Sequence, residues 1–278
     1  MAELIIAVTG AGGRLGRFIV PKLEASGYTI RSLSEVYTYG LCTKNFRPFL
    51  RGCHGLVHCA FAHLPGKYRG GEGDDPEAFW DLNYNATKRL LEDARSERLN
   101  RAILFSSRAI FGDAQVLPAK PNPDTLYGKL KLSIETLALN VSDTKFPIVT
   151  LRPTGVYGGE AKINKWTPIF EKALLGSLPS INPITTEVSG RTVAEAVALS
   201  LSQTGNSMAG QIYNLSDAKV SLQQILSFAG FDTDTMPFST KLKGPELPND
   251  RLQELGLVFP GLPGIISAAQ ELYAELTV

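Results

Sequence analysis

Residues 9–16 read TGAGGRLG, and they lie between a predicted buried strand and a predicted amphipathic helix. The short apolar run at 4–9 predicts the strand, and apolar residues at helical spacing over 14–26 predict the helix. Gly10, Gly13 and Gly16 recur at three-residue steps, which allows a tight turn and close approach of the backbone to a pyrophosphate. The N–H groups at the helix start can bind phosphates. The stretch therefore predicts a dinucleotide site.

Strands and helices continue to alternate through the first half of the chain. We expect strands at 28–33, 56–60, 102–106 and 148–151, helices at 77–98 and 125–140, and loops with one short helix at 35–54. This order predicts an α/β fold with a doubly wound, mostly parallel sheet that is covered on both faces. The alternation fades after residue 158. We therefore expect a dinucleotide-binding core at 1–158 and a smaller substrate-binding lobe at 159–278, interleaved with the last strands of the sheet.

Composition excludes several functional classes. The chain has 278 residues with 28 basic and 27 acidic side chains, and 44% of it is apolar. A chain of this kind folds, and it has no overall charge that would attract nucleic acid or an anionic membrane. Cys42, Cys53 and Cys59 lack metal-ligand spacing, so we expect reduced thiols and no metal site. No basic leader and no run of about 20 apolar residues is found, so we expect a cytoplasmic protein without a membrane partner.

A tyrosine and a lysine four residues apart are the candidate catalytic pair. Tyr127 and Lys131 share one face of the predicted helix 125–140. A tyrosine with its ordinary pKa of about 10 is a poor acid or base until a nearby cation stabilises its phenolate. Ser107 follows the strand 102–106 at the carboxyl end of the sheet, where ligands bind in open α/β folds. Its hydroxyl could hold a substrate oxygen beside Tyr127.

Taken together, these motifs resemble the extended short-chain dehydrogenase/reductases, the NAD-dependent epimerase/dehydratase family. The matching segments are 9–16, 58–60, 83–87, 106–112, 127–131 and 151–158. The resemblance implies a Rossmann-type fold and an enzyme that moves a hydride at C4 of nicotinamide, coupled to proton transfer. The resemblance implies that Tyr127 is the general acid/base. It implies that Lys131 lowers the pKa of Tyr127 and binds the nicotinamide ribose, and that Ser107 binds the substrate.

The resemblance also implies the binding residues. The cofactor contacts are Gly10, Gly12, Gly13, Arg14, Leu15, Ser34, Ala60, Ser106, Tyr127, Lys131, Pro153 and Thr154. For the substrate we expect contacts from Ser107, Arg108, Trp166 and Arg191, although Trp166 could equally serve packing and Arg191 could be a solvated surface charge. Asn83 matches a structural asparagine of the active-site helix.

The choice of cofactor depends on one position at the end of the second strand. A carboxylate there favours NAD, whereas a neutral residue tolerates the 2′-phosphate of NADP. The family pattern places Ser34 at this position, and Arg14 or Arg31 could add positive charge. We therefore expect NADP. A shift of one residue would make Glu35 the ribose ligand, so NAD stays open.

The second half of the chain favours a small substrate. Family members that act on nucleotide sugars carry an arginine for the diphosphate, and Val188 occupies that position here, with Arg191 three residues on. We therefore expect an NAD(P)-dependent oxidoreductase for a small, sugar-like hydroxy or carbonyl compound. The alternatives are a nucleotide-sugar epimerase/dehydratase with tightly bound NAD and a non-catalytic NADP-sensing protein.

Two further expectations concern assembly and access. The resemblance suggests a homodimer that packs through the helices 77–98 and 125–140, where Leu91, Leu130 and Ile134 lie either on outer faces or in the core. The glycine-rich segment 65–75 is either a lid over the active site or a surface loop.

Overall fold

The computed structural model describes residues 4–33, 45–64, 71–112, 114, 117, 120–203, 208–237 and 246–278. The chain forms two compact units. The first contains residues 1–112, 120–152 and 194–213, and the second contains 113–119, 153–193 and 214–278. The chain therefore crosses between the units several times. The functional division expected at residue 158 stays a prediction, because compactness alone assigns no function to either unit.

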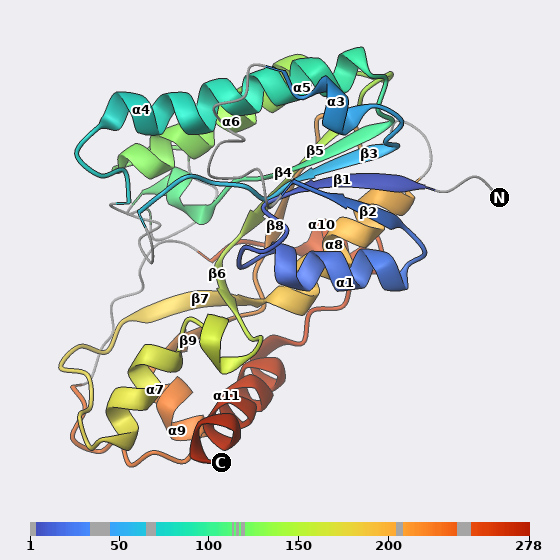
Figure 1. The fold of residues 1–278 in the computed structure, drawn as a ribbon. Helices are drawn as coiled ribbons and strands as arrows, with labels where there is room; N and C mark the ends of the chain where they lie inside the picture. Colours follow the sequence, from blue (N-terminus) through green and yellow to red (C-terminus); the bar gives the residue numbers. More distant parts are fainter. Residues whose placement is uncertain are drawn as a thin grey trace. The chain divides into compact units, whose positions relative to one another are not determined.

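The first unit is built on a six-stranded sheet with the strand order β2-β1-β3-β4-β5-β8 (Figure 1). Its strands are β1 (Ile5–Thr9), β2 (Thr29–Ser32), β3 (Gly55–His58), β4 (Arg101–Phe105), β5 (Ile148–Pro153) and β8 (Ile212–Leu215). All pairings from β2 to β5 are parallel. The predicted doubly wound, Rossmann-type α/β fold is confirmed.

Helices cover both faces of this sheet, which explains why every residue of β3 and β4 is buried. In Figure 1, α4, α5 and α6 lie on one side, and α1 and α8 lie on the other. The helices are α1 (Gly16–Ala25), α3 (Arg47–Leu50), α4 (Pro76–Trp80), α5 (Ala86–Ser96), α6 (Leu126–Val141) and α8 (Gly190–Ser202). An ion pair of 2.6 Å between Lys22 and Glu195 joins α1 to α8.

The core of the first unit lies between the sheet and α5 and α6. Leu91, Leu130 and Ile134 belong to it and are at most 4% exposed. Of the two alternatives for these side chains, the core is therefore confirmed, and they do not offer an apolar outer face. The homodimer stays a prediction without their support.

The predicted helix 77–98 contains a turn of π-helix, η2 (Asp81–Asn85), between α4 and α5. Two side chains bond to main-chain carbonyls at this turn. Asn83 Nδ2 donates to Phe79 O at 2.8 Å, and Thr87 Oγ1 donates to Asn83 O at 2.6 Å. Such side-chain bonds compete with the regular helix ladder, and π turns often occur at functional sites.

The second unit has a three-stranded sheet of its own, with the order β6-β7-β9. Its elements are β6 (Gly155–Tyr157), β7 (Ile184–Ser189), β9 (Ala218–Ser221), the helices α7 (Thr167–Leu174), α9 (Leu222–Phe228), α10 (Asp250–Gln253) and α11 (Gly261–Thr277), and a 3₁₀ turn η4 (Ala161–Ile163). The sheet, α7, α9 and α11 share a hydrophobic core. Among the described residues, no helix combines the length and the apolarity that crossing a bilayer requires.

Candidate active site

The order of the strands reverses between β1 and β3. From β1 the chain goes to β2 on one side of it and then returns to β3 on the other side. Parallel strands end at the same edge, so Thr9, His58 and Phe105 bring their following loops together there. Ligands of doubly wound sheets bind at such a switch point. The glycine loop and Ser107 follow these strand ends, as predicted. Ala60 and Ser106, expected as the last residues of their strands, lie just beyond them.

The glycine loop packs so closely that two positions accept only glycine. Gly10 has a φ of +66°, and a Cβ atom there would lie 2.8 Å from the main-chain nitrogen of Ala60. A Cβ atom on Gly16 would lie 2.3 Å from the carbonyl oxygen of Gly10. At Gly12, by contrast, a Cβ atom would have no heavy atom within 4 Å. The loop is therefore tight toward the sheet and open on the side of Gly12.

This edge fits a dinucleotide. The loop residues lead into α1, whose first-turn N–H groups can bind phosphate oxygens. The space at Gly12 lets a ligand approach the main chain. Ser106 is 3% exposed, and its hydroxyl has no hydrogen-bond partner among the described residues, so a bound polar group would satisfy it. Gly10, Gly12, Gly13, Leu15 and Ser106 are thus where cofactor contacts are expected.

The α6 helix places Tyr127 in its first turn and Lys131 one turn later. The Thr125 side chain caps this helix by accepting from Gly128 N at 3.1 Å. Gly128 itself packs against the 3₁₀ turn η3 (Arg108–Phe111), where its Cβ would lie 2.6 Å from Ala109 O. Ser107 caps that turn, since its Oγ accepts from Ala109 N at 3.2 Å. The close Gly128 contact therefore brings the turn that carries Tyr127 against the turn that Ser107 begins.

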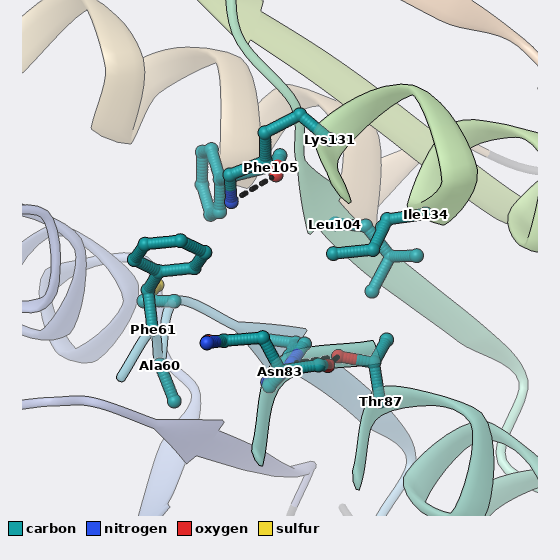
Figure 2. A pocket seen from close by; sticks show the side chains of 10 residues that line it. Ala60, Phe61, Asn83, Thr87, Leu104, Phe105, Lys131 and Ile134 are labelled. Carbon is teal, nitrogen blue, oxygen red and sulfur yellow. Dashed lines mark hydrogen bonds between the residues drawn. The ribbon is translucent and has the colours of Figure 1, made fainter. Parts of the chain in front are cut away.

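Lys131 is a buried cation, only 7% exposed. Its Nζ donates to Phe105 O at 3.0 Å, the bond drawn in Figure 2. The same Nζ lies 4.3 Å from the ring centroid of Phe61 and 5.7 Å from that of Tyr127. Burial lowers the pKa of Lys131 to about 8, against the opposing effect of nearby Cys59 and Glu135.

A small cavity of about 20 Å³ lies beside this lysine, large enough for one water molecule. Figure 2 shows the side chains around it. They come from the ends of β3 and β4 and the residues that follow β3, from the π turn, from the start of α5 and from α6, and they are His58, Cys59, Ala60, Phe61, Asn83, Thr87, Leu104, Phe105, Lys131 and Ile134. Burial raises the pKa of the Cys59 thiol far above its usual value, so this cysteine is held in its neutral form.

A chain of buried polar groups supports the ends of β1 and β3. Thr9 Oγ1 lies 2.6 Å from His58 Nδ1, and His58 Nε2 lies 2.9 Å from Thr87 Oγ1. Burial, followed by the charge of Lys131, lowers the pKa of His58 to about 3. His58 is therefore a neutral structural group at ordinary pH.

Two of the predicted substrate residues, Trp166 and Arg191, fall in the second unit. Trp166 is 3% exposed, and it stacks on Tyr157 with ring centroids 5.1 Å apart, which fits the packing alternative. Arg191 is exposed at the start of α8. Val188 is fully buried in β7. Thr154 bonds through its N and its Oγ1 to Leu215 O, at 2.9 and 3.2 Å.

Several other predicted contacts can be placed by element. Arg14 lies in the glycine loop, Arg108 lies in η3, and Pro153 ends β5. Ser34 and Glu35 lie outside the described residues, as does most of the segment expected to form a lid.

Arg31, considered as a source of charge for the 2′-phosphate or as a solvated residue, makes main-chain contacts that were not predicted, and its charge toward a 2′-phosphate stays a prediction. Its Nη1 donates to the carbonyls of Phe49 and Arg51 at 2.8 and 2.7 Å, so its guanidinium ties β2 to the region of α3.

Phe61 is one of the site residues that were not predicted. Phe61 follows Ala60 and contacts both Lys131 and Tyr127. A bulky aromatic residue directly after a strand end, at the edge where ligands bind, is the only signal in the sequence. It is a weak signal, because such a residue more often packs in the core.

Comparison with known proteins begins with a family model. Residues 6–215 match the model described as the NAD dependent epimerase/dehydratase family. The sterol-4-alpha-carboxylate 3-dehydrogenase, decarboxylating, of Mus musculus is 26% identical over 171 residues, which are 54% of this chain and 45% of the mouse protein.

A second relative is the 4-hydroxy-2-methyl-3-oxo-4-farnesyl-3,4-dihydroquinoline-1-oxide ketoreductase of Stigmatella aurantiaca. It is 28% identical over 175 residues, which are 55% of this chain and 50% of the ketoreductase. The chain thus spans about half the length of the curated relatives it matches.

Two solved structures share the fold over nearly the whole chain. MoeE5 in complex with UDP-glucose and NAD has a TM-score of 0.78 at 22% identity, covering 98% of this chain and 99% of MoeE5. The UDP-glucuronic acid 4-epimerase of Bacillus cereus, in complex with UDP-glucuronic acid and NAD, has a TM-score of 0.77 at 20% identity and covers 99% of both chains.

The family match extends over more than half of the sequence, from the strand before the glycine loop to the last strand of the large sheet. It confirms the resemblance drawn from the motifs, and with it the expectation of an NAD-dependent enzyme family. The chain belongs to the NAD dependent epimerase/dehydratase family.

Proposed function

We propose that this protein is an NAD(P)-dependent oxidoreductase that moves a hydride to or from a small, sugar-like hydroxy or carbonyl compound. The observation that carries the proposal is the buried Lys131 ammonium beside the Tyr127 ring on α6. A dehydrogenase and a ketoreductase among the curated relatives support this type of reaction.

In this proposal, Tyr127 gives or takes the proton of the substrate oxygen. The positive charge of Lys131 stabilises the phenolate, which makes proton transfer possible at neutral pH. The oxygen of Ser107 accepts from Ala109 N, so its own O–H can donate to the substrate oxygen. The glycine loop binds the pyrophosphate, and the bound cofactor supplies or accepts the hydride.

The role of Tyr127 can be tested with Tyr127→Phe. NADPH or NADH oxidation is measured against a panel of small aldehydes, ketones and oxidised sugars. Loss of the proton donor should lower kcat by about 10²–10⁴-fold. Binding of the cofactor should change less than about twofold, and Tyr273→Phe, in the core of the second unit, should retain full activity. Retained turnover in Tyr127→Phe would refute the assignment.

We further propose NADP as the preferred cofactor, on the basis of Ser34. Titration of stripped protein with NADPH and NADH tests this preference, and far weaker binding of NADH supports it. Tight NAD that resists stripping, with no net consumption of reduced cofactor, would instead support a nucleotide-sugar epimerase/dehydratase. The homodimer and the cytoplasmic location are proposals as well, which sedimentation and cell fractionation would test.

A further inference from the structure

The Phe61 ring joins the two residues of the proposed catalytic pair. It meets the Tyr127 ring edge to face, with centroids 5.3 Å apart at 88°. It also faces Lys131, whose Nζ lies 4.3 Å from its centroid. Figure 2 shows the lysine amine directed at this ring on one side and at Phe105 O on the other. The ammonium is thus held between a ring face and a carbonyl oxygen.

The main chain on both sides of Phe61 is anchored. On one side, Ala60 N donates to Thr9 Oγ1 at 3.2 Å. On the other side, Ala62 N donates to Asn83 Oδ1 at 2.8 Å, and Asn83 Nδ2 donates back to Ala62 O at 3.0 Å. Bonds from β1 and from the π turn therefore fix the point from which the Phe61 side chain extends.

The ring itself is held by a second set of contacts. Phe79 meets it edge to face at 5.7 Å, and His63 stacks on it at 5.9 Å. Because the Phe61 ring is fixed by these contacts, it does not adjust to the position of Lys131. The Lys131 ammonium instead lies where it can contact both the ring face and the carbonyl oxygen of Phe105. Attraction between a cation and the ring face is strongest where exposure to solvent is low, as it is for the buried Lys131.

We propose that Phe61 is a positioning residue, which holds the Lys131 ammonium charged and at a fixed distance from Tyr127. This role rests on the proposed function of the pair, whereas the contact between ring and ammonium can be tested without it. The titratable groups around Lys131 come from the end of β3 and from α6. Cys59 and Glu135 raise its pKa against the effect of burial, while His58 and Tyr127 also lie near its charge.

The first experiment measures the lysine directly. Protein labelled with ¹³C-lysine is titrated by NMR, and the resonance of Lys131 is identified by its absence from Lys131→Arg. Phe61→Leu keeps an apolar side chain but removes the ring face, so the charged form loses its attraction. The pKa of Lys131 should fall by about half a unit to one unit. Phe61→Tyr keeps the ring face and should restore the wild-type value.

A matched control separates this effect from general loss of packing. Phe46→Leu makes the same change at a fully packed phenylalanine of the same core, which has no ring contact with Lys131 among the described residues. It should leave the pKa of Lys131 unchanged. An unchanged or raised pKa in Phe61→Leu would overturn the proposal, as would an equal shift in Phe46→Leu.

The second experiment tests positioning in turnover. In Phe61→Leu, kcat/KM should begin to fall at a lower pH than in the wild type. The shift in pH should equal the shift of the Lys131 pKa in the NMR titration, and Phe61→Tyr should restore the wild-type profile. An unchanged profile together with a shifted NMR pKa would overturn the positioning role and leave the contact intact. If Tyr127→Phe retains activity, the proposed function fails, and the NMR experiment still decides on the contact.

Discussion

The hydroxyl of Thr9 lies 2.6 Å from Nδ1 of His58, and its neighbours determine which ring nitrogen carries the hydrogen. Thr87 gives its hydrogen to Asn83 O, so His58 Nε2 must be the donor to Thr87. His58 Nδ1 therefore accepts from Thr9, whose oxygen in turn accepts from Ala60 N. The donors and acceptors of this buried chain of hydrogen bonds can therefore be arranged in one direction only. That arrangement requires the neutral Nε2–H tautomer of His58.

Removing the Thr9 hydroxyl should destabilise the protein. Thr9→Val keeps the size of the side chain but leaves His58 Nδ1 and Ala60 N without partners. Leaving buried polar groups unpaired costs about 1–3 kcal/mol each. Urea denaturation should show a loss within this range or somewhat above it, and Thr9→Ser should retain most of the stability. Equal stability of the valine and serine variants would contradict the directed chain.

Acid should weaken the fold through His58. Its pKa is lowered to about 3 in the folded protein, whereas in the unfolded chain it is near 6.5. Below pH 6.5 the unfolded chain binds a proton that the folded protein does not. The contribution of neutral His58 to the free energy of unfolding is thus complete above pH 6.5 and decreases as the pH falls toward 3. From pH 6.5 to pH 5 the wild type should lose about 2 kcal/mol more than His58→Gln. His63→Gln, outside the buried chain, should behave as the wild type, and equal losses in all three proteins would contradict the prediction.

Much of the fold follows from local sequence signals. The apolar runs of β1, β3 and β4 and the spacing of the glycine loop predict strands, parallel order and phosphate-binding edge, because each signal is local and strong. The pair Tyr127 and Lys131 is also local, as residues four apart on one helix.

Other features depend on contacts between distant residues. The π turn lies where the Asn83 and Thr87 side chains donate hydrogen bonds to main-chain carbonyls. Asn83 also bonds to Ala62, in the segment that follows β3. Helical periodicity does not reveal such an interruption. The Arg31 contacts likewise need carbonyls that are 18 and 20 residues away in sequence. The small sheet β6-β7-β9 mixes parallel and antiparallel pairs of short strands, which give no clear period.

The glycine loop should separate stability from cofactor binding. Gly16→Ala places a Cβ atom 2.3 Å from Gly10 O and should lower the stability severely. Gly12→Ala meets no atom within 4 Å, so the free energy of unfolding should change by less than about 0.5 kcal/mol. If the ligand approaches the loop at Gly12, the Kd for NADPH or NADH should rise about tenfold or more in this variant, measured by fluorescence titration. Unchanged cofactor affinity would place the pyrophosphate elsewhere.

The charge of Lys131 should limit activity at high pH. Its pKa of about 8 means that the ammonium is lost above that pH, together with its effect on Tyr127. The profile of kcat/KM, which reports the free enzyme, should therefore fall above about pH 8. Lys131→Arg keeps a positive charge at all accessible pH values, so any remaining activity should not show this fall. A profile that stays level to pH 10 in the wild type would contradict the assignment.

The α6 helix is attached to β5 by a bidentate ion pair one turn beyond Lys131. Arg152 Nε and Nη2 donate to the two carboxylate oxygens of Glu135 at 2.6 and 2.7 Å, and the Glu135 side chain is 3% exposed. Breaking such a pair from one side leaves a buried charge and should cost about 3–5 kcal/mol, as in Glu135→Leu or Arg152→Met. The double variant removes both charges and should be more stable than either single variant, since neither charge is left unpaired. Urea denaturation of the four proteins gives the coupling energy, and simple additivity of the two losses would show that the pair does not act as a unit.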